Sequence, residues 1–592
     1  MSARFLITCA DERSWKSERP VVFLGEWCRR IDREHAWGAL EGVVARPVRF
    51  DGAERERVIS RIDALSRELL AELTELLNRL HGVGRSQRYW RILLGHWLHR
   101  YTALLFHRWH AVQQVLADHQ ISGTIVFTGP AAQLAGHDTV ALSWASNDDV
   151  WNNVLIGRVL HESASVPIEY RELQKEHPSS ALSGAAPAGS NKPVLSPAKL
   201  IDRTLGVFQR ATSSFVVSSY LPPWQSALLS MRLGDVPRLR RSPPVQPAAV
   251  DMHFRTANRL EPRAQRGLPA FARRMLLEML PTCYLEGFAA LHRQVAQQGW
   301  PNRPRLIFTS NGFDTSEVFK LWAAQKAEDG SPYILGQHGS NYGTASYCPS
   351  EIECVETGDA FITWGWRGNN AKCRPAFIFK TAGRSRGKWR PGGGLLLVED
   401  CLPHLTTAWD PYPGFAAYQE DQFRFVERLP EAVKRALTVR LHAEYRKMSW
   451  GDAERWRRRL PAVLLEEGTA RLSGLIRRSR LVVHTYDSTG VLENLALDIP
   501  TLCFWAGGTR HLRASAVPAY GLLLDAGILH ATAESAARKV ADIWDDVGAW
   551  WRSEAVQGPR TKFIEQYAKT ATRPVRSLKR LLVESASVAR DC

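Results

Sequence analysis

A glycine-rich polar segment is the strongest candidate for chemistry in this sequence. The segment Gly336–Gly343 reads GQHGSNYG and directly follows the apolar run Tyr333–Leu335. Its three glycines allow sharp turns and close approach of the backbone to a ligand. The alternative is an ordinary glycine-rich turn in which the histidine satisfies local backbone. The groups suited to a sugar or phosphate are Gln337, His338, Gly339, Ser340 and Asn341.

A second polar segment starts a predicted helix. The stretch Tyr486–Gly490 reads YDSTG and follows the apolar run at 481–483. Ser488 and Thr489 precede the helix, where free amides and the helix dipole favour an anion. Helix capping is the alternative reading, and it uses the same geometry. Tyr486 belongs to this segment, and Glu493 within the helix is placed to meet a sugar or ribose hydroxyl.

A third strand end carries Arg440 and His442, after the apolar run at 437–439. These side chains are suited to neutralising charge on a departing phosphate. A histidine at a strand end can equally be a structural residue. In parallel sheets, ligands bind outside the carboxyl ends of strands, so we expect His338, His442 and Ser488 to gather in one anion pocket.

Two N-terminal carboxylates are candidates for a catalytic base. Glu26 follows the apolar run at 21–24 and is flanked by Gly25 and Trp27. The alternative is an ion pair with a neighbouring arginine. Asp149 follows Asp148 at a predicted helix start, where the favoured interpretation is an N-cap by one of the two aspartates.

No metal site is predicted. His107 and His110 stand three residues apart, but no nearby carboxylate or cysteine completes a metal-binding set. The nine cysteines include no CxxC pair, and we expect them to be reduced thiols. No Walker A sequence, GxGxxG after the first strand, or GxSxG elbow is present, which counts against P-loop, dinucleotide and serine-hydrolase chemistry.

The elements that must position these residues follow an α/β rhythm. Short apolar runs end in polar turns and alternate with helical segments, which predicts mostly parallel sheets covered on both faces. With 592 residues, the chain is too long for one core and fits two large α/β lobes. Residues 1–300 form the predicted N-terminal lobe, with a helical insertion at about 54–118 and a flexible loop at about 179–199. Residues 301–592 form the predicted C-terminal lobe and terminal helices.

Composition limits the partners. The formal charge of +17 predicts attraction to an anionic ligand or membrane face. Nucleic acid is not expected, because the sequence has no zinc-finger spacing, RNP motif or basic zipper. The N-terminus lacks a secretory apolar region, and no apolar segment is long enough to span a bilayer. We therefore expect a cytoplasmic protein with, at most, peripheral contact at the inner membrane.

Five motifs are distributed along the chain. They are Gly25-Glu26-Trp27-Cys28, Arg88-Tyr89-Trp90-Arg91-Ile92, the segment 337–343, Thr363-Trp364-Gly365-Trp366, and the segment 486–490 with Glu493. Together these motifs, which span most of the chain, resemble a family of transferases encoded in surface-polysaccharide and O-antigen loci, first noted in leptospires.

The C-terminal half also resembles the donor domain of two-lobed, GT-B-type glycosyltransferases. Arg440-Leu441-His442 and Ser488-Thr489 look like the motifs by which sialic acid and Kdo transferases hold a CMP-sugar. Those enzymes commonly follow the histidine with proline, whereas this chain has Ala443, so a UDP-type donor stays open. Glycerophosphotransferases of teichoic-acid assembly share similar motifs.

The resemblance implies two facing Rossmann-like lobes with the acceptor on the N-terminal side and the activated sugar on the C-terminal side. We expect a metal-independent glycosyltransferase without a cofactor, which moves a sugar from a nucleotide donor to a polysaccharide or lipid-linked acceptor. In this hypothesis the strand-end groups stabilise the departing phosphate, and Glu26 or Asp149 deprotonates the acceptor. The competing hypotheses are a glycerophosphotransferase and a non-catalytic glycan- or nucleotide-binding protein of an assembly complex.

Overall fold

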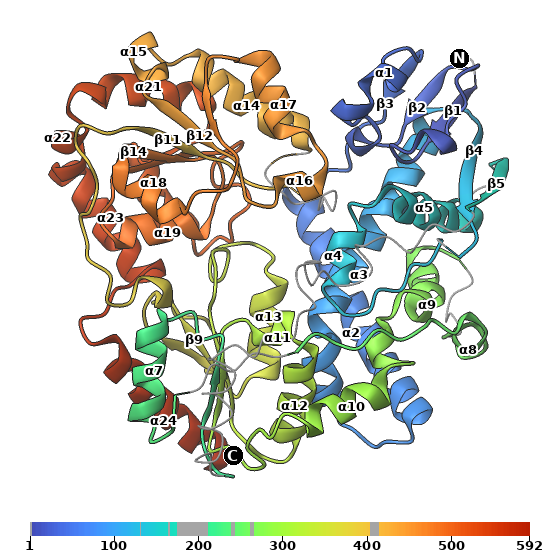
Figure 1. Ribbon diagram of the computed structural model, residues 1–592, viewed down its shortest axis with the longest axis horizontal. Coiled ribbons are helices and arrows are strands. Elements are labelled where there is room, and N and C mark those ends of the chain that lie inside the picture. The colour runs from blue at the N-terminus through green and yellow to red at the C-terminus, as the bar shows by residue number, and fades with distance from the viewer. Residues whose placement is uncertain are drawn as a thin grey trace, which may run out of the picture.

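In the computed structural model, the strands of the described residues form three parallel sheets, with helices packed around them (Figure 1). The structure describes residues 3–130, 132–163, 166–173, 211–237, 243–260, 266–402, 412 and 414–591. The flexible loop predicted at 179–199 lies outside these residues.

The N-terminal sheet has the strand order β3-β2-β1-β4-β5. The chain order reverses between β1 and β4, as in doubly wound folds. Its strands are β1 (Arg4–Ile7), β2 (Val21–Phe23), β3 (Gly42–Val44), β4 (Ile121–Thr128) and β5 (Ile168–Glu172).

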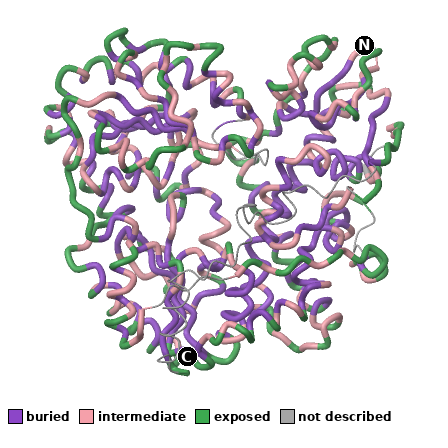
Figure 2. The backbone as a smooth tube through the Cα atoms, in the orientation of Figure 1, coloured by how far each residue is buried: buried purple, intermediate pink, exposed green. Residues whose placement is uncertain are grey.

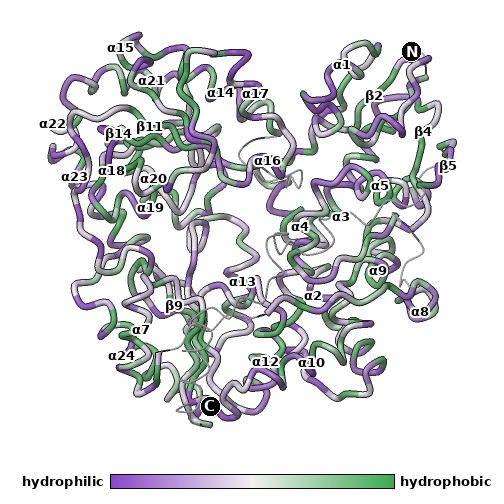
Figure 3. Tube along the Cα trace, in the orientation of Figure 1, coloured by the Kyte–Doolittle hydropathy of each residue, from purple (hydrophilic) through white to green (hydrophobic). Residues whose placement is uncertain are grey.

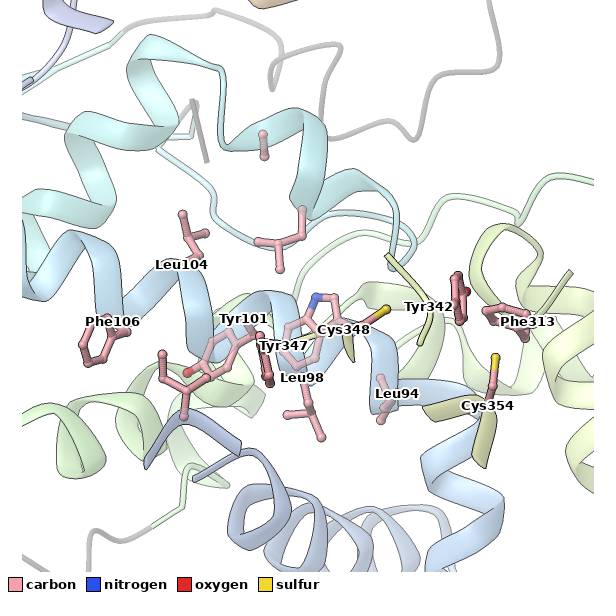
Figure 4. Packing of buried hydrophobic residues seen from close by; sticks show 14 of the residues in the cluster. Leu94, Leu98, Tyr101, Leu104, Phe106, Phe313, Tyr342, Tyr347, Cys348 and Cys354 are labelled. Atoms are coloured by element: carbon pink, nitrogen blue, oxygen red, sulfur yellow. The ribbon is translucent and has the colours of Figure 1, made fainter. Parts of the chain in front are cut away.

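Two long helices, α2 (Gly52–His81) and α3 (Gln87–Asp118), lie between β3 and β4, where the helical insertion is predicted. Gly82 ends α2 in the left-handed conformation, with φ 63°. The aromatic side chains of α3 belong to the core, since Trp90, Trp97 and Tyr101 are buried. Figure 4 shows Leu98 and Tyr101 of α3 beside Tyr347 and Cys348, so this helix packs against the segment that follows the glycine-rich loop.

The middle sheet has the order β10-β9-β8-β7-β6. Its first strand, β6, lies before residue 300 and pairs with β7 after it, so the predicted lobe boundary falls inside this sheet. The strands are β6 (Phe215–Val217), β7 (Ile307–Thr309), β8 (Tyr333–Gly336), β9 (Ala360–Thr363) and β10 (Cys373–Pro375).

The C-terminal sheet has the order β13-β12-β11-β14-β15-β16, which is the Rossmann strand order. The prediction of an α/β protein with Rossmann-like parallel sheets is therefore confirmed. The strands are β11 (Gly394–Val398), β12 (Leu437–Arg440), β13 (Leu464–Glu466), β14 (Ser479–His484), β15 (Thr501–Phe504) and β16 (Leu529–His530).

The strands are the apolar centres of their layers. Figure 2 shows the sheets as mostly buried and the outer helices as mixed, and Figure 3 shows hydrophobic residues concentrated along β9 and its neighbours. The last helix, α24 (Pro574–Asp591), returns to the middle sheet and packs against α7 (Pro223–Arg232). Within the described ranges, every helix is too short or too polar to cross a lipid bilayer.

A buried ion pair joins the helices around the middle sheet. Glu317, in the first turn of α12 (Glu317–Glu328), lies 2.7 Å from Lys320 Nζ and accepts from Thr139 N at 3.0 Å. Lys320 Nζ also donates to the Leu93 carbonyl of α3 at 3.2 Å. Both charged side chains are buried.

We predict that Glu317→Ala lowers the free energy of unfolding by about 3–5 kcal/mol, because it leaves the Lys320 ammonium buried without a counter-charge. Denaturant titration followed by tryptophan fluorescence measures the loss. Glu356→Ala is the control: it removes an exposed partner of Arg91 and should cost about 1 kcal/mol or less. Equal effects of the two substitutions would contradict the buried-pair argument.

Candidate functional site

The glycine-rich loop of the middle sheet meets a helix start of the C-terminal sheet. The Ser340 backbone N–H donates to Thr489 Oγ1 at 3.0 Å, and the Ser340 hydroxyl donates to the Asp487 carbonyl at 3.3 Å. A Cβ on Gly339 would lie 3.3 Å from Thr489 Oγ1, so glycine permits this close approach. The structure thus brings the predicted loop of His338 and the predicted segment of Ser488 together.

The helix behind this contact, α19 (Thr489–Ala496), offers unpaired donors. Ser488 caps it, with Val491 N donating to Ser488 Oγ at 3.4 Å. The amides of Thr489 and Gly490 make no hydrogen bond with any residue the structure describes. These two N–H groups and the helix dipole form an anion-attracting helix start opposite the glycine-rich loop.

A buried histidine, His484, contacts the N-cap residue Ser488 and Asn494 of this helix. Asn494 donates to His484 Nε2 at 3.1 Å, so the neutral ring keeps its hydrogen on Nδ1, which lies 3.4 Å from Ser488 Oγ. A Cβ on Gly490 would lie 2.6 Å from His484 Cε1, which explains the glycine. The sequence patterns assigned His484 no role; its spacing of four residues from Ser488 was the available signal.

His338 lies in a largely buried aromatic setting. Its Nδ1 is 2.9 Å from the Tyr342 hydroxyl, and its ring centroid is 5.6 Å from that of Tyr220 and 5.7 Å from that of Phe313. Burial lowers the pKa of His338 to about 4, against the opposing effect of Asp314. His338 is therefore neutral near pH 7, so it can exchange hydrogen bonds but does not supply positive charge.

Two neighbours of His338 are unusual: Tyr220 has a left-handed backbone, and Asp314 is a mostly buried acid that no sequence pattern indicated. Tyr220, beside His338, has φ 61°, an unusual conformation that often occurs at functional sites. Asp314 Oδ2 accepts from Arg100 of α3 at 2.6 Å, and the buried Oδ1 has no hydrogen-bond partner among the described residues. Burial would raise the pKa of Asp314, but Arg100 and His96 hold it well below its usual range. Asp314 lies in the short helix α11 (Gly312–Thr315), and the sequence patterns assigned it no role.

The Gln337 side chain is buried and hydrogen-bonds within the glycine-rich loop. It is buried, accepts from Trp364 N and Trp366 Nε1 at 2.9 Å each, and donates to the Gly339 carbonyl at 2.9 Å. Asn341, by contrast, is exposed and has a positive φ of 73°.

The third predicted strand end lies at the same carboxyl edge of the C-terminal sheet. Arg440 Nε is 3.5 Å from Glu466 Oε2, and His442 Nδ1 accepts from Glu444 N at 3.2 Å. Burial and Arg440 lower the pKa of His442, whereas Glu444 raises it. Within the described part of the chain, no hydrogen bond or ion pair joins His442 to His338 or Ser488.

Tyr486 links the second and third strand ends electrostatically. Burial raises the pKa of Tyr486, helped by Asp400 after β11 and opposed by its hydrogen bond with Ser488 and by Arg440. Groups that follow or end β11, β12 and β14 therefore all influence the pKa of this phenol.

Glu493 bridges the two sheets. Its carboxylate lies 3.4 Å from Lys380 Nζ and 3.9 Å from Arg384 Nη1, and both cations come from the segment after β10. Lys380 is a cation near the site that no sequence pattern indicated. Its charge becomes relevant only because the fold brings it to α19.

The two proposed bases lie in the N-terminal sheet. Glu26 Oε2 accepts from Ala416 N at 3.0 Å, in the first turn of α14 (Phe415–Glu427). Asp149 accepts from Ala10 N at 2.9 Å and pairs with Arg30 at 3.0 Å. Burial raises the pKa of Asp149, while Arg30 lowers it.

Neither carboxylate makes a described hydrogen bond or ion pair with the glycine-rich loop or with α19. The predicted N-cap belongs to Asp148, which accepts from Trp151 N at 2.9 Å. Among the residues that the structure covers, no group of three or more His, Cys, Asp or Glu side chains could hold a metal ion.

The fold and site define a Rossmann-type α/β protein with an anion-attracting helix start between two parallel sheets. The chain belongs to the LIC12162 family of transferases, whose model matches residues 4–582. It is therefore a transferase.

Comparison with solved structures finds distant matches. MurG of Acinetobacter baumannii matches with 11% identity and a TM-score of 0.29, over 66% of this chain and 95% of that chain. Anabaena HepE in complex with UDP and glucose matches with 11% identity and a TM-score of 0.33, over 54% of this chain and 89% of that chain. A variant of the wall teichoic acid polymerase TagF matches with 9% identity and a TM-score of 0.28, over 51% and 86%. Comparison with curated proteins finds no match.

The buried neutral histidine makes a pH prediction. Burial lowers the pKa of His484 to about 4 in the folded protein, compared with about 6.5 when unfolded. Between these values only the unfolded state takes up this proton, so stability falls as the pH drops from about 6.5 to about 4.

In His484→Gln, the slope of unfolding free energy against pH in this window should be smaller by up to about 1.4 kcal/mol per pH unit. Denaturant titrations at several pH values measure both slopes. Identical slopes in wild type and variant would show that His484 does not carry this dependence.

Proposed function

We propose that this transferase is a glycosyltransferase that moves a sugar from a nucleotide-activated donor to a growing surface polysaccharide or lipid-linked acceptor. The proposal is carried by one observation: the unpaired amides of Thr489 and Gly490 are held against the glycine-rich loop by the Ser340–Thr489 hydrogen bond. That arrangement suits a phosphate at the junction of two parallel sheets.

The donor chemistry follows from these groups. Amides at the start of α19 stabilise negative charge on the phosphate as the sugar leaves, and they need no reorganisation because the helix fixes them. His338 and His442 contribute as neutral hydrogen-bonding groups. A CMP-linked acidic sugar is favoured by the resemblance of Arg440-Leu441-His442 and Ser488-Thr489, and Ala443 keeps a UDP-type donor open.

The basic surface gives limited support to membrane contact. Three of the four arginines of α17 (Asp452–Arg459) are paired with carboxylates: Arg457 with Glu467, Arg458 with Glu34 and Arg459 with Glu427, whereas Arg455 donates to the Trp450 carbonyl. A lipid-linked acceptor therefore rests on the net charge of the whole chain, not on this cluster.

A nucleotide screen tests the donor. Melting temperatures with CMP, UDP, GDP and dTDP should show a rise with one of them, because a ligand at about 100 times its Kd stabilises the folded state by about 2.7 kcal/mol. Thr489→Val removes the hydroxyl that receives the Ser340 amide, so we expect it to reduce that rise. Thr572→Val, at an exposed position, is the matched control. No rise with any nucleotide would refute the donor assignment.

Turnover separates the competing functions. His442→Ala and Ser488→Ala should lower transfer from the activated sugar by about 10²-fold or more if these groups stabilise the transition state. Intact transfer in both variants would overturn the site assignment. Nucleotide binding without turnover of any activated sugar would favour a non-catalytic binding protein. Transfer of glycerophosphate in place of a sugar would favour the polymer-forming alternative.

A further inference from the structure

A second pocket lies between the N-terminal sheet and the start of α14. Its volume is about 350 Å³, within the range of small-molecule sites. The chain after β2 and β3 forms much of the wall, α3 contributes His107 and Ala111, and Gly414 and Trp450 close it from the C-terminal sheet. It is thus built at the carboxyl ends of parallel strands and at a domain junction, where ligands commonly bind.

One fixed carboxylate supplies hydrogen-bonding capacity in this pocket. Glu26 Oε2 accepts from Ala416 N at 3.0 Å, while Oε1 makes no hydrogen bond with any described residue. A Cβ on Gly414 would lie 2.7 Å from Glu26 Oε2, so glycine permits this approach. The helix thereby fixes the carboxylate and leaves one oxygen available as an acceptor.

The two tryptophans that line this pocket, Trp27 and Trp450, contribute apolar ring surface and no free polar group. Trp27 Nε1 donates to the Thr8 carbonyl at 3.1 Å, and Trp450 Nε1 donates to the Leu402 carbonyl at 2.7 Å. Both indole N–H groups are therefore satisfied by backbone. What remains for a ligand is aromatic and aliphatic surface, with Val44 and Val48 completing the wall.

The charge of the pocket disfavours an anion. Arg46 is the one described lining side chain that is positive at every physiological pH, and Asp118 holds it through two hydrogen bonds of 2.9 Å. A phosphate would meet the Glu26 carboxylate, and the only described lining cation, Arg46, is already paired; Arg455, outside the lining, interacts electrostatically with Glu26 and donates to the Trp450 carbonyl at 3.0 Å. A nucleotide therefore fits α19 and not this pocket.

We propose that this pocket binds an uncharged pyranoside, with an apolar ring face against Trp27 or Trp450 and a hydroxyl donating to Glu26 Oε1. Such a sugar combines an apolar face with hydroxyl donors, which matches an apolar wall that carries one carboxylate acceptor. The binding of this pyranoside is independent of the proposed glycosyltransferase function. Its role as the acceptor in the transfer reaction rests on that proposed function.

Saturation-transfer NMR on the full chain tests the binding. The probes are methyl glycosides of glucose, galactose, mannose and N-acetylglucosamine, with methyl glucuronide as the charged comparison. Ala45→Phe fills the pocket, Glu26→Gln removes the charge but keeps an acceptor for Ala416, and Ala549→Phe is an exposed control.

At least one neutral glycoside should give a signal with wild type and Ala549→Phe, and none with Ala45→Phe. Glu26→Gln should weaken its binding by about tenfold, and the glucuronide should bind more weakly than its neutral counterpart. An unchanged melting temperature verifies the fold of each variant. If Ala45→Phe fails to fold, the Glu26→Gln result decides.

Three results would overturn the inference: no neutral glycoside binds wild type, binding survives both Ala45→Phe and Glu26→Gln, or the glucuronide binds best. The nucleotide screen is read separately on the same proteins. Pocket-dependent glycoside binding without any nucleotide effect would refute the donor proposal and leave this site standing. A nucleotide effect without glycoside binding would support the donor proposal and refute this glycoside pocket.

Discussion

The candidate site depends on a backbone contact between two sheets. The Ser340 amide reaches Thr489 across the junction, and Gly339 provides the space for that approach. Further along, Ala345 and Leu512 form an antiparallel bridge. Glu351 accepts from Gly343 N and binds both terminal nitrogens of Arg513. The glycine-rich loop is therefore held at several points against the C-terminal sheet, and the start of α19 has a fixed position relative to it.

The site attracts anions through oriented dipoles more than through net charge. The chain carries +17 overall, yet the cations near the site are paired: Lys380 and Arg384 with Glu493, and Arg440 with Glu466. His338 and His484 are neutral because burial lowers their pKa values to about 4. The amides at the start of α19 add positive potential that no carboxylate neutralises among the described hydrogen bonds. This arrangement suits a phosphate, and among the described residues no group of three or more His, Cys, Asp or Glu side chains could hold a metal ion.

The N-terminal sheet extends the protein beyond the pair of sheets that form this site. Helix α3 connects it to the middle sheet, since Arg100 pairs with Asp314 and Arg91 pairs with Glu353. Glu26 connects it to the C-terminal sheet by accepting from the first turn of α14. The N-terminal sheet thus contacts both other parts of the molecule. The pocket beside Glu26 exists only because these contacts hold two separate chain segments in place.

The sequence by itself determined the local structure and the polar ends of the strands. Apolar runs such as 333–335 and 481–483 became buried parallel strands, because hydrophobic periodicity depends on nearby residues alone. The polar segments that follow these strands, recognisable from their glycine content, lie in contact with each other. Tertiary structure decided how the strands were grouped: β6 and β7 look like members of different lobes in sequence but pair in one sheet. It also decided that Glu26 accepts from the Ala416 amide, 390 residues away in the sequence, and that the Gln337 side chain is buried. These outcomes depend on which surfaces pack together, and a strand's pattern of apolar residues is the same whichever neighbour it pairs with.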